Sequence, residues 1–313
     1  MWRPSPAATL PGMSDTQNPA LDLSNALASA VDKAGASVVQ VSARHGIGSS
    51  GVVWSPDGVL VAADHNVERD EGITVGLPDG STVPATLVGR DPGTDLAVLR
   101  VEATGLATPD WSDLAGLRVG NLVLGLLRPG QSIRATLGIV SALGDEAWRT
   151  HSGGRIDRYV QTDLDILKGF SGGLLVDAAG HALGLNNAGL WRKHAIAIPH
   201  ATLARVVGSL LEHGRIRRGY LGIGLAPVRL PGPIAEATGQ AVGLLVMGVQ
   251  PGSTAEQGGL LLGDILVSLD GEGVADLGQL QAVLGEDRIG TEVTAKIVRG
   301  GEVRELRLTV GAK

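Results

Sequence analysis

A serine set among glycines offers the clearest chemistry in this sequence. Ser171 lies in a Gly-Phe-Ser-Gly-Gly run at residues 169–173. Nucleophilic attack on a carbonyl needs an exposed hydroxyl, a nearby base and backbone N–H groups aimed at the developing oxyanion, and glycines let the backbone approach closely. Because 47 of the 313 residues are glycine, such a run also arises in ordinary turns. The motif therefore indicates a nucleophile only if the chain also supplies a base and an acid elsewhere.

Both partners are available upstream of the serine. Histidine titrates near neutral pH, so it can take and return a proton. Among the seven histidines, His65 follows an apolar strand expected at residues 59–62, which would present it from a rigid support. Asp95 leads directly into another apolar strand, expected at residues 96–101. That position favours a buried carboxylate, which could orient the imidazole.

The elements that must hold these residues are mostly strands. Short apolar runs alternate with turn sequences such as Ser-Pro-Asp-Gly at residues 55–58, and this spacing indicates a barrel or a sandwich. One helix is expected at residues 21–31, and another opens at Pro199 with an apolar stripe that includes Leu211. Strands are expected at residues 37–41, 51–54, 59–62, 73–77, 82–88, 96–101, 122–127, 135–142, 159–162, 174–177, 182–186 and 195–198.

The length predicts about two domains. We expect a disordered tail at residues 1–20, a β-rich domain at 21–214, a linker at 215–219 and a smaller mixed domain at 220–313. In the smaller domain the patterns predict strands at residues 244–249, 265–269, 293–298 and 303–310, and helices at 254–257 and 276–284.

Composition excludes several classes of function. A net charge of −6 argues against nucleic acid as a partner, and the absence of cysteine excludes disulfides, thiolate chemistry and cysteine-ligated metals. One short basic cluster spans residues 215–218. A polar stretch at residues 144–158 holds three arginines and is too long for a tight turn, so it is a candidate functional loop. The first twenty residues contain no apolar run long enough for a signal peptide or a membrane span.

The order His65, Asp95, Ser171 along two β-rich halves is that of chymotrypsin-like proteases, and the sequence resembles the HtrA/Deg family of serine proteases. The likeness runs from about residue 21 to residue 313. It implies a mostly β fold, with a double six-stranded barrel of chymotrypsin type followed by a PDZ domain. The matching motifs, in family order, are Gly-Val-Val at 51–53, Thr-Asp-Leu-Ala-Val-Leu at 94–99, Gly-Ile-Val-Ser-Ala at 138–142, Gln-Thr-Asp at 161–163, Ser-Gly-Gly at 171–173, Pro-Gly-Ser-Thr-Ala at 251–255 and Gly-Asp-Ile-Leu at 263–266.

The resemblance also implies roles. Ser171 would attack a peptide carbonyl, His65 would act as general base and then general acid, and Asp95 would orient it. The N–H groups of Gly169 and Ser171 would form the oxyanion hole, with no metal or cofactor. The function implied is an ATP-independent endopeptidase that cleaves unfolded or damaged proteins in quality control. A regulatory protease that cuts one partner would have the same site.

Substrate preference is left with two alternatives. By the resemblance, Ile166, Gly189 and Leu190 line a medium apolar S1 pocket suited to Val, Ala or Leu at P1. Asp165 lies six residues before Ser171, the offset at which trypsins place the carboxylate that selects a basic P1. A solvated carboxylate is the commoner fate of such a residue, so we favour the apolar pocket.

The smaller domain is expected to bind peptide C-termini. A PDZ-like module adds a peptide strand to a sheet edge and holds the terminal carboxylate with clustered N–H groups. The loop that would do this comprises Tyr220, Leu221, Gly222 and Ile223, and the helix at 276–284 would form the other wall of the groove.

Two departures from the family pattern bear on activity. Lys168 and Phe170 stand where the family usually has proline and asparagine, and Asn66 follows His65 where the family has valine. We therefore expect a loop before Ser171 that rests in a partly inactive shape until peptide binds. The alternative function is a chaperone-like protein that holds polypeptides, with weak or peptide-activated proteolysis.

Assembly and compartment follow only from the resemblance. Family members form trimers through an N-terminal segment, so a homo-oligomer is expected, although residues 21–37 lack the aromatic anchors that this segment often carries. The family is commonly periplasmic or in the cell envelope. Without a recognisable signal peptide, a cytoplasmic location is also conceivable.

Overall fold

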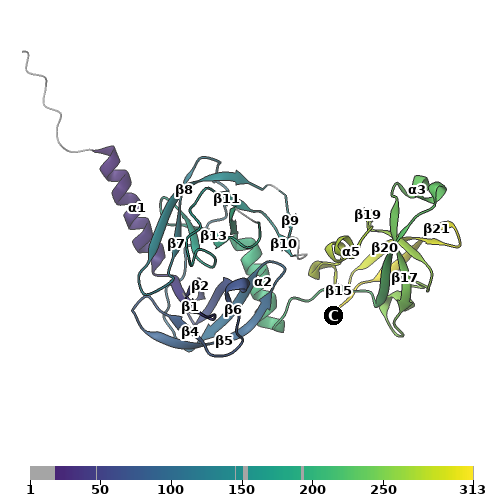
Figure 1. The fold of residues 1–313 in the computed structure, drawn as a ribbon, viewed down its shortest axis with the longest axis horizontal. Helices are drawn as coiled ribbons and strands as arrows, with labels where there is room; N and C mark the ends of the chain where they lie inside the picture. Colours follow the sequence, from purple (N-terminus) through teal and green to yellow (C-terminus); the bar gives the residue numbers. More distant parts are fainter. Residues whose placement is uncertain (1–17, 47, 145, 151–153, 192–193, 313) are drawn as a thin grey trace, which may run out of the picture.

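Two closed β-barrels and a smaller mixed domain make up the described chain. The computed structural model describes residues 18–46, 48–144, 146–150, 154–191 and 194–312. Figure 1 shows the barrels in purple to teal, and the smaller domain in green and yellow after a short extended segment. The expected double-barrel architecture is confirmed. No helix among these residues has the length and apolar character needed to cross a bilayer.

Antiparallel pairing closes both barrels. The first has the order β1-β2-β3-β6-β5-β4 and the second the order β11-β14-β13-β12-β7-β8. All twelve strands lie within three residues of the bounds expected from sequence, because each apolar run ends at a turn signal. Their bounds are β1 Val38–Ser42, β2 Ser49–Ser55, β3 Val59–Ala63, β4 Ile73–Gly76, β5 Thr82–Asp91, β6 Leu96–Val101, β7 Leu122–Leu127, β8 Arg134–Leu143, β11 Val160–Thr162, β12 Leu174–Asp177, β13 Ala182–Asn187 and β14 Ala195–Ile198.

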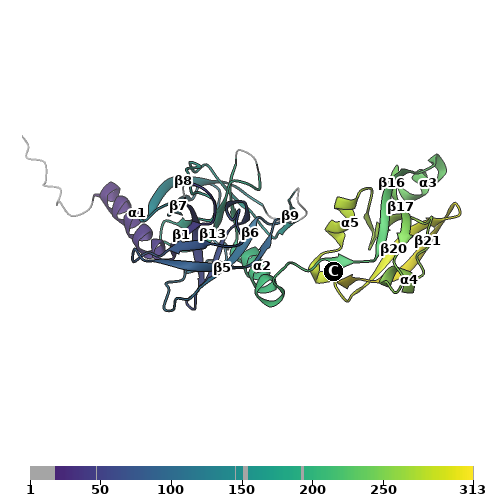
Figure 2. The ribbon, with the colours of Figure 1, turned by 60° about the horizontal axis from the view of Figure 1, so that its bottom comes forward.

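The first helix, α1 (Pro19–Gly35), begins two residues before the expected start. The Asn18 side chain caps it by accepting the N–H groups of Ala20 and Leu21, and proline suits its first turn. Its last turns bury Ala30 and Ala34 in the cluster that contains strands of both barrels, while the first turns project from the barrels (Figure 2). The expected tail lies outside the described residues up to residue 17.

Helix α2 (His200–His213) packs between the two barrels. Leu203, Val206, Val207 and Leu210 are fully buried. Leu211 is 41% exposed, so its inclusion in the apolar stripe was wrong. At 3.6 residues per turn, residue 211 falls past the edge of a stripe centred on 203, 207 and 210. Gly214 ends the helix with φ +69°, a conformation that glycine adopts without strain.

The polar stretch at residues 144–158 is a short hairpin rather than an irregular loop. Strands β9 (Trp148–Arg149) and β10 (Arg155–Ile156) pair antiparallel, and residues 145 and 151–153 lie outside the description. Trp148 stacks on Trp191 at a centroid distance of 5.7 Å. This contact ties the hairpin to the segment that follows Leu190, next to the expected substrate pocket.

The smaller domain is a sheet with the order β16-β17-β18-β20-β21 and short helices. Its edge strand β16 and helix α3 were missed from sequence. The groove helix α5 is capped by Asp276, as expected, through the Gln279 N–H. The bounds are β15 Gly219–Tyr220, β16 Ile223–Arg229, α3 Gly232–Thr238, β17 Val242–Val249, α4 Thr254–Gln257, β18 Ile265–Leu269, β19 Glu272–Gly273, α5 Leu277–Val283, the 3₁₀ turn η2 Glu286–Arg288, β20 Glu292–Arg299, β21 Glu302–Thr309 and β22 Gly311–Ala312.

A buried ion pair anchors this domain. Asp264 is 1% exposed and accepts hydrogen bonds from Nε and Nη2 of Arg299, both at 2.7 Å, and from the Leu261 N–H at 2.8 Å. Burial alone would raise the pKa of Asp264, but the bonds from Arg299 and the Leu261 amide outweigh it and hold the pKa below its usual value. The carboxylate therefore stabilises the domain above the pKa of an unfolded aspartate, and this contribution is lost as pH falls through the lowered pKa.

Replacing Asp264 with asparagine is expected to destabilise the smaller domain by about 2–3 kcal/mol at pH 7, because Arg299 loses its charged partner but stays partly hydrated. Thermal unfolding of the full chain would measure the change. The difference between wild type and Asp264→Asn should shrink as the pH falls below about 4. Arg307→Gln is the matched control, since the Arg307–Glu292 pair is exposed and should matter little. Equal effects of the two substitutions would contradict this role of Asp264.

Candidate active site

One end of the first barrel holds His65 and Asp95 side by side. His65 lies in the 3₁₀ turn η1 (Asp64–Asn66) after β3, and Asp95 precedes β6, which pairs with β3. Asp95 Oδ2 lies 2.6 Å from His65 Nδ1, and Asp95 Oδ1 accepts the His65 backbone N–H at 2.9 Å. This pairing leaves Nε2 as the ring nitrogen available for proton transfer.

Arg90 supports the turn that carries His65. Its Nη1 lies 3.2 Å from the Asp64 carboxylate and donates to the Val67 carbonyl at 3.0 Å, so it holds both sides of the turn. Burial raises the pKa of Asp64, and the charge of Arg90 opposes that rise. The strand β5, which ends in Arg90 and Asp91, is thereby attached to the turn that carries the candidate base.

The second barrel brings Ser171 against this pair. Ser171 is 6% exposed, and its carbonyl accepts a hydrogen bond from Asn66 Nδ2 at 3.2 Å. Gly172 has φ +87°, and a Cβ there would lie 2.1 Å from the Ser50 carbonyl oxygen, so only glycine fits this approach of the two barrels. Asn66, which stands where the family pattern has valine, therefore links the turn that carries His65 to the serine.

The Ser171 hydroxyl has a different partner from the one that catalysis requires. The Ala188 backbone N–H donates to Ser171 Oγ at 3.1 Å. Across the described residues, no hydrogen bond joins Ser171 Oγ to His65. A serine nucleophile must pass its proton to the base, so this arrangement is a resting one and not a reacting one.

Asn187 is a buried neighbour that sequence reasoning did not find. It is fully buried, and its Nδ2 donates to Asp95 Oδ2 at 2.7 Å. Its Oδ1 accepts the N–H groups of Gly189 and Leu190, at 2.8 and 2.9 Å. The segment after β13 is thus folded onto the acid of the candidate triad. In the sequence, the only sign of this role is that Asn187 is a polar residue at the end of an apolar strand.

The loop before Ser171 is anchored from two sides. Ser50 Oγ donates to the Gly169 carbonyl at 2.6 Å and accepts the Arg128 backbone N–H at 2.8 Å. Phe170 is 1% exposed and packs in the core of the second barrel. The aromatic ring therefore points away from the site and fixes the loop. Within the described chain, no hydrogen bond occupies the N–H groups of Gly169 and Ser171, so both remain available to an oxyanion.

The residues expected to form the S1 pocket are only partly gathered. Gly189 lies against the candidate triad, since a Cβ there would be 2.9 Å from Asp95 Oδ2 and 3.0 Å from His65 Nδ1. Leu190 packs on the large core cluster. Asp165 and Ile166 are both exposed, Ile166 by 47%. An enclosed apolar pocket is therefore not assembled around Ile166 in this resting arrangement.

The expected peptide-binding loop lies beside an open sheet edge. The carbonyls of Leu221 and Gly222 accept the N–H groups of Ala255 and Gln250, whereas no described contact uses the Leu221 and Gly222 amides. Ile223 begins the edge strand β16 and packs on the apolar cluster that contains Leu280 of α5. Tyr220 lies in β15 at the entrance to this loop, and its hydroxyl bonds Gln250.

Comparisons with known proteins agree with this architecture. Residues 49–185 match the family described as "Trypsin-like peptidase domain", and residues 219–310 match "PDZ domain". A probable periplasmic serine endoprotease DegP-like of Chlamydia pneumoniae is 31% identical over 273 residues, which cover 85% of this chain and 55% of that protein. A probable periplasmic serine protease do/HhoA-like of Haemophilus influenzae is 31% identical and 58% covered. The chain thus spans a little over half the length of these curated relatives.

Solved structures match over almost their whole length. The HtrA-type protease AlgW with tripeptide is 32% identical, with a TM-score of 0.67, and the match covers 92% of this chain and 97% of that one. The serine endoprotease from Yersinia pestis is 29% identical, with a TM-score of 0.68 and coverages of 92% and 98%. Fold and site define a chymotrypsin-like serine protease domain followed by a PDZ domain. More particularly, the chain belongs to the HtrA-type serine proteases.

Replacing Asn187 with leucine is expected to lower kcat by about 10- to 100-fold, because Asp95 loses a hydrogen bond to its charged form, and to raise KM as well, because Gly189 and Leu190 lose their bonds to Asn187 Oδ1. Steady-state cleavage of a peptide substrate would measure both constants. Asn186→Leu is the matched control: Asn186 is equally buried, but its side-chain nitrogen has no hydrogen-bond partner in the described chain. A similar loss in both variants would point to a packing effect and contradict the positioning role.

Proposed function

We propose that this chain is a serine endopeptidase in which Ser171 is the nucleophile, His65 the base and Asp95 the orienting acid. One observation carries the proposal. The turn that bears His65, which is paired with Asp95, is hydrogen-bonded through Asn66 to the carbonyl of Ser171. The proposed nucleophile on one barrel therefore meets the base and the acid of the other barrel where the two barrels touch, as acyl transfer requires.

The reaction would proceed in two balanced steps. Ser171 Oγ attacks the peptide carbonyl while His65 Nε2 takes its proton, and the oxyanion is held by the N–H groups of Gly169 and Ser171. His65 then returns the proton to the leaving amine, and the acyl-enzyme forms. Water repeats the sequence and releases the acid. Asp95 keeps the imidazole in the tautomer that has Nε2 unprotonated.

Ser171→Ala is expected to lower the cleavage of casein by at least about 10³-fold, because no other group can form the acyl-enzyme. Gel electrophoresis of a time course would measure the loss of substrate. The polypeptide should still bind the Ser171→Ala chain, which separates lost chemistry from lost folding. Equal digestion by wild type and Ser171→Ala would sink the endopeptidase proposal and favour a chaperone-like holding function.

The resting contact at the nucleophile favours activation by peptide as a second feature of the function. Ser171 Oγ accepts the Ala188 N–H, and a hydroxyl that accepts one hydrogen bond can still donate its own proton, so catalysis requires Oγ to come within hydrogen-bond distance of His65 Nε2. A substrate or ligand that moves the 187–190 segment, to which Oγ is bonded, would allow that approach. Low basal activity that rises with added peptide fits this arrangement, whereas full activity on a small peptide without a lag would not.

For the P1 residue we propose a medium apolar side chain bounded by Ile166, Gly189 and Leu190. The exposure of Asp165 supports this preference, since a solvated carboxylate selects a basic side chain weakly. Peptides with Val or Arg at P1 separate the two alternatives. A strong preference for Arg would assign the selection to Asp165.

We assign recognition of peptide C-termini to Tyr220, Leu221, Gly222 and Ile223. The two unoccupied amides and the open edge of β16 support this assignment. A C-terminal apolar peptide should bind at least about tenfold more tightly than its amidated form, because amidation removes the carboxylate that the amides would hold. Fluorescence anisotropy with both peptides measures this ratio. Equal affinities would contradict carboxylate capture, and the addition of a peptide strand to β16 would then be the only mode of binding that the result supports.

The whole protein is proposed to act on unfolded or damaged polypeptides in the cell envelope. The names of the relatives, which are periplasmic serine proteases, support that compartment. A homo-oligomer, by family resemblance a trimer, would cover the exposed Leu21 and Leu23 on the projecting part of α1.

A further inference from the structure

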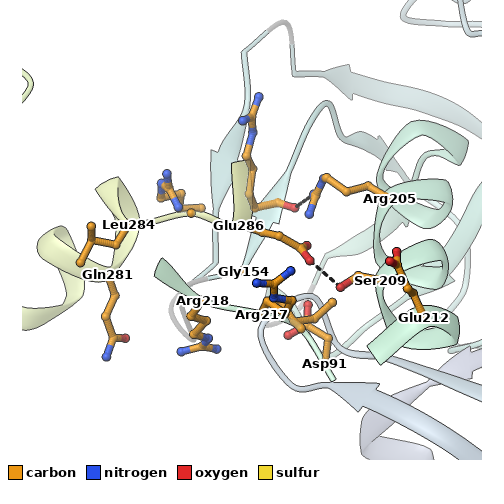
Figure 3. A pocket seen from close by; sticks show the side chains of 14 residues that line it. Asp91, Gly154, Arg205, Ser209, Glu212, Arg217, Arg218, Gln281, Leu284 and Glu286 are labelled. Carbon is orange, nitrogen blue, oxygen red and sulfur yellow. Dashed lines mark hydrogen bonds between the residues drawn. The ribbon is translucent and has the colours of Figure 1, made fainter. Parts of the chain in front are cut away.

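A cavity lies where the barrels, the linker and the smaller domain meet (Figure 3). Ser171 is not among the residues that line it. Its volume is about 390 Å³. Five arginines line it: Arg149 and Arg155 from the β9–β10 hairpin, Arg205 from α2, and Arg217 and Arg218 from the linker. Apart from Arg205, these arginines come from the two basic stretches of the sequence, residues 144–158 and 215–218, which the proposed peptidase site does not use. In a chain with a net charge of −6, their convergence on one cavity is a concentration of positive charge.

The acidic side chains in the wall do not fully neutralise this charge. Asp91 accepts bonds from the Gly93 N–H and from the N–H and hydroxyl of Thr94, at 3.0, 3.2 and 2.7 Å. Glu286 accepts the Ser209 hydroxyl at 2.7 Å across the interface between α2 and the smaller domain (Figure 3). Glu212 is exposed on the rim. Together with Asp157, which pairs with Arg155 and Arg205, four carboxylates thus balance five guanidinium groups.

Several of the guanidinium groups retain donor capacity. Arg217 and Arg218 make no ion pair or hydrogen bond with any described residue. Arg155 and Arg205 share a single carboxylate, that of Asp157, at 3.1 and 3.3 Å. A guanidinium carries five N–H donors in a planar fork, so most of the donors of these four arginines are unused.

We propose that this cavity binds a compact linear polyphosphate, meaning a ligand with two or more adjacent phosphate groups. Planar guanidinium forks match phosphate oxygens in paired hydrogen bonds, and several forks around one volume match several linked phosphates. None of the described residues that line the cavity is aromatic, so these residues offer a nucleobase no stacking surface. The recognition is therefore of the phosphate chain, whether free or carried by a nucleotide.

The position of the cavity gives binding a structural consequence. A ligand held by Arg205 and by the linker arginines would fix the linker against α2. The linker is already attached to the first barrel, since Arg215 forms a β-bridge with Arg90. A bound polyphosphate is therefore expected to slow tryptic cleavage at Arg217 and Arg218.

Titration calorimetry of the full chain with sodium tripolyphosphate tests the proposal, with ATP and orthophosphate as comparison ligands. Tripolyphosphate should bind one to one, ATP no more tightly, and orthophosphate at least about tenfold more weakly, with affinities that fall as salt rises. The Ser171→Ala chain should bind equally, so the result does not depend on the peptidase proposal. Equal, weak binding of all three ligands, or tighter binding of an acidic peptide, would overturn the proposal.

Variants of the cavity complete the test. The double substitution of Arg217→Gln and Arg218→Gln should weaken tripolyphosphate binding by at least about tenfold and abolish protection of the linker. Arg134→Gln, at an exposed arginine of β8 outside the cavity, is the matched control and should leave the affinity unchanged. Glu212→Gln removes a like charge from the rim and should strengthen binding about two- to fivefold, a gain that misfolding cannot produce. Unchanged affinity in all three variants would refute the assignment.

Discussion

The site depends on how closely two separate barrels approach each other. His65 and Asp95 belong to one barrel and Ser171 to the other, and the backbone of Gly172 rests on the Ser50 carbonyl with no room for a Cβ. Ser50 also reaches across to the Gly169 carbonyl, and Asn66 reaches to that of Ser171. The spacing of the proposed nucleophile and base is therefore set by backbone contact rather than by flexible side chains, and the glycines after Ser171 are needed for that contact.

His65 and Asp95 could be chosen from the sequence because each stands at one end of an apolar run that predicts a rigid strand, and Ser171 could be chosen because glycines flank it. Their supporting residues could not be chosen in this way. Ser50 and Asn187 are polar residues whose partners lie 119 and 92 positions away in the chain, so their contacts exist only after the barrels close. Phe170 departs from the family pattern, and from the sequence we expect it to disturb the loop before Ser171. Burial in the second barrel makes it an anchor instead, and sequence alone does not give the direction of a side chain in a loop.

The same distinction holds for the fold. The barrel strands were found because apolar runs end at Pro, Asp and Gly turn signals. Strand β16 was missed because it contains Pro227 and Gly224, which break the pattern of a buried strand but are tolerated at a sheet edge. Helix α3 has no buried residue, so it has no apolar period to detect. Tertiary context, and not local propensity, determines these two elements.

The open edge of β16 also has a cost for the protein. Unpaired N–H and C=O groups that can receive a peptide can equally pair with a strand of another molecule, which is the first step of ordered aggregation. Pro227 cannot donate a hydrogen bond, and Arg229 places a charge at the end of the strand. A second long strand that began to pair anywhere from Ile223 to Leu225 would meet Pro227 within four residues and Arg229 within six. The proposed peptide-binding edge thus leaves room for a short chain end and resists polymerisation.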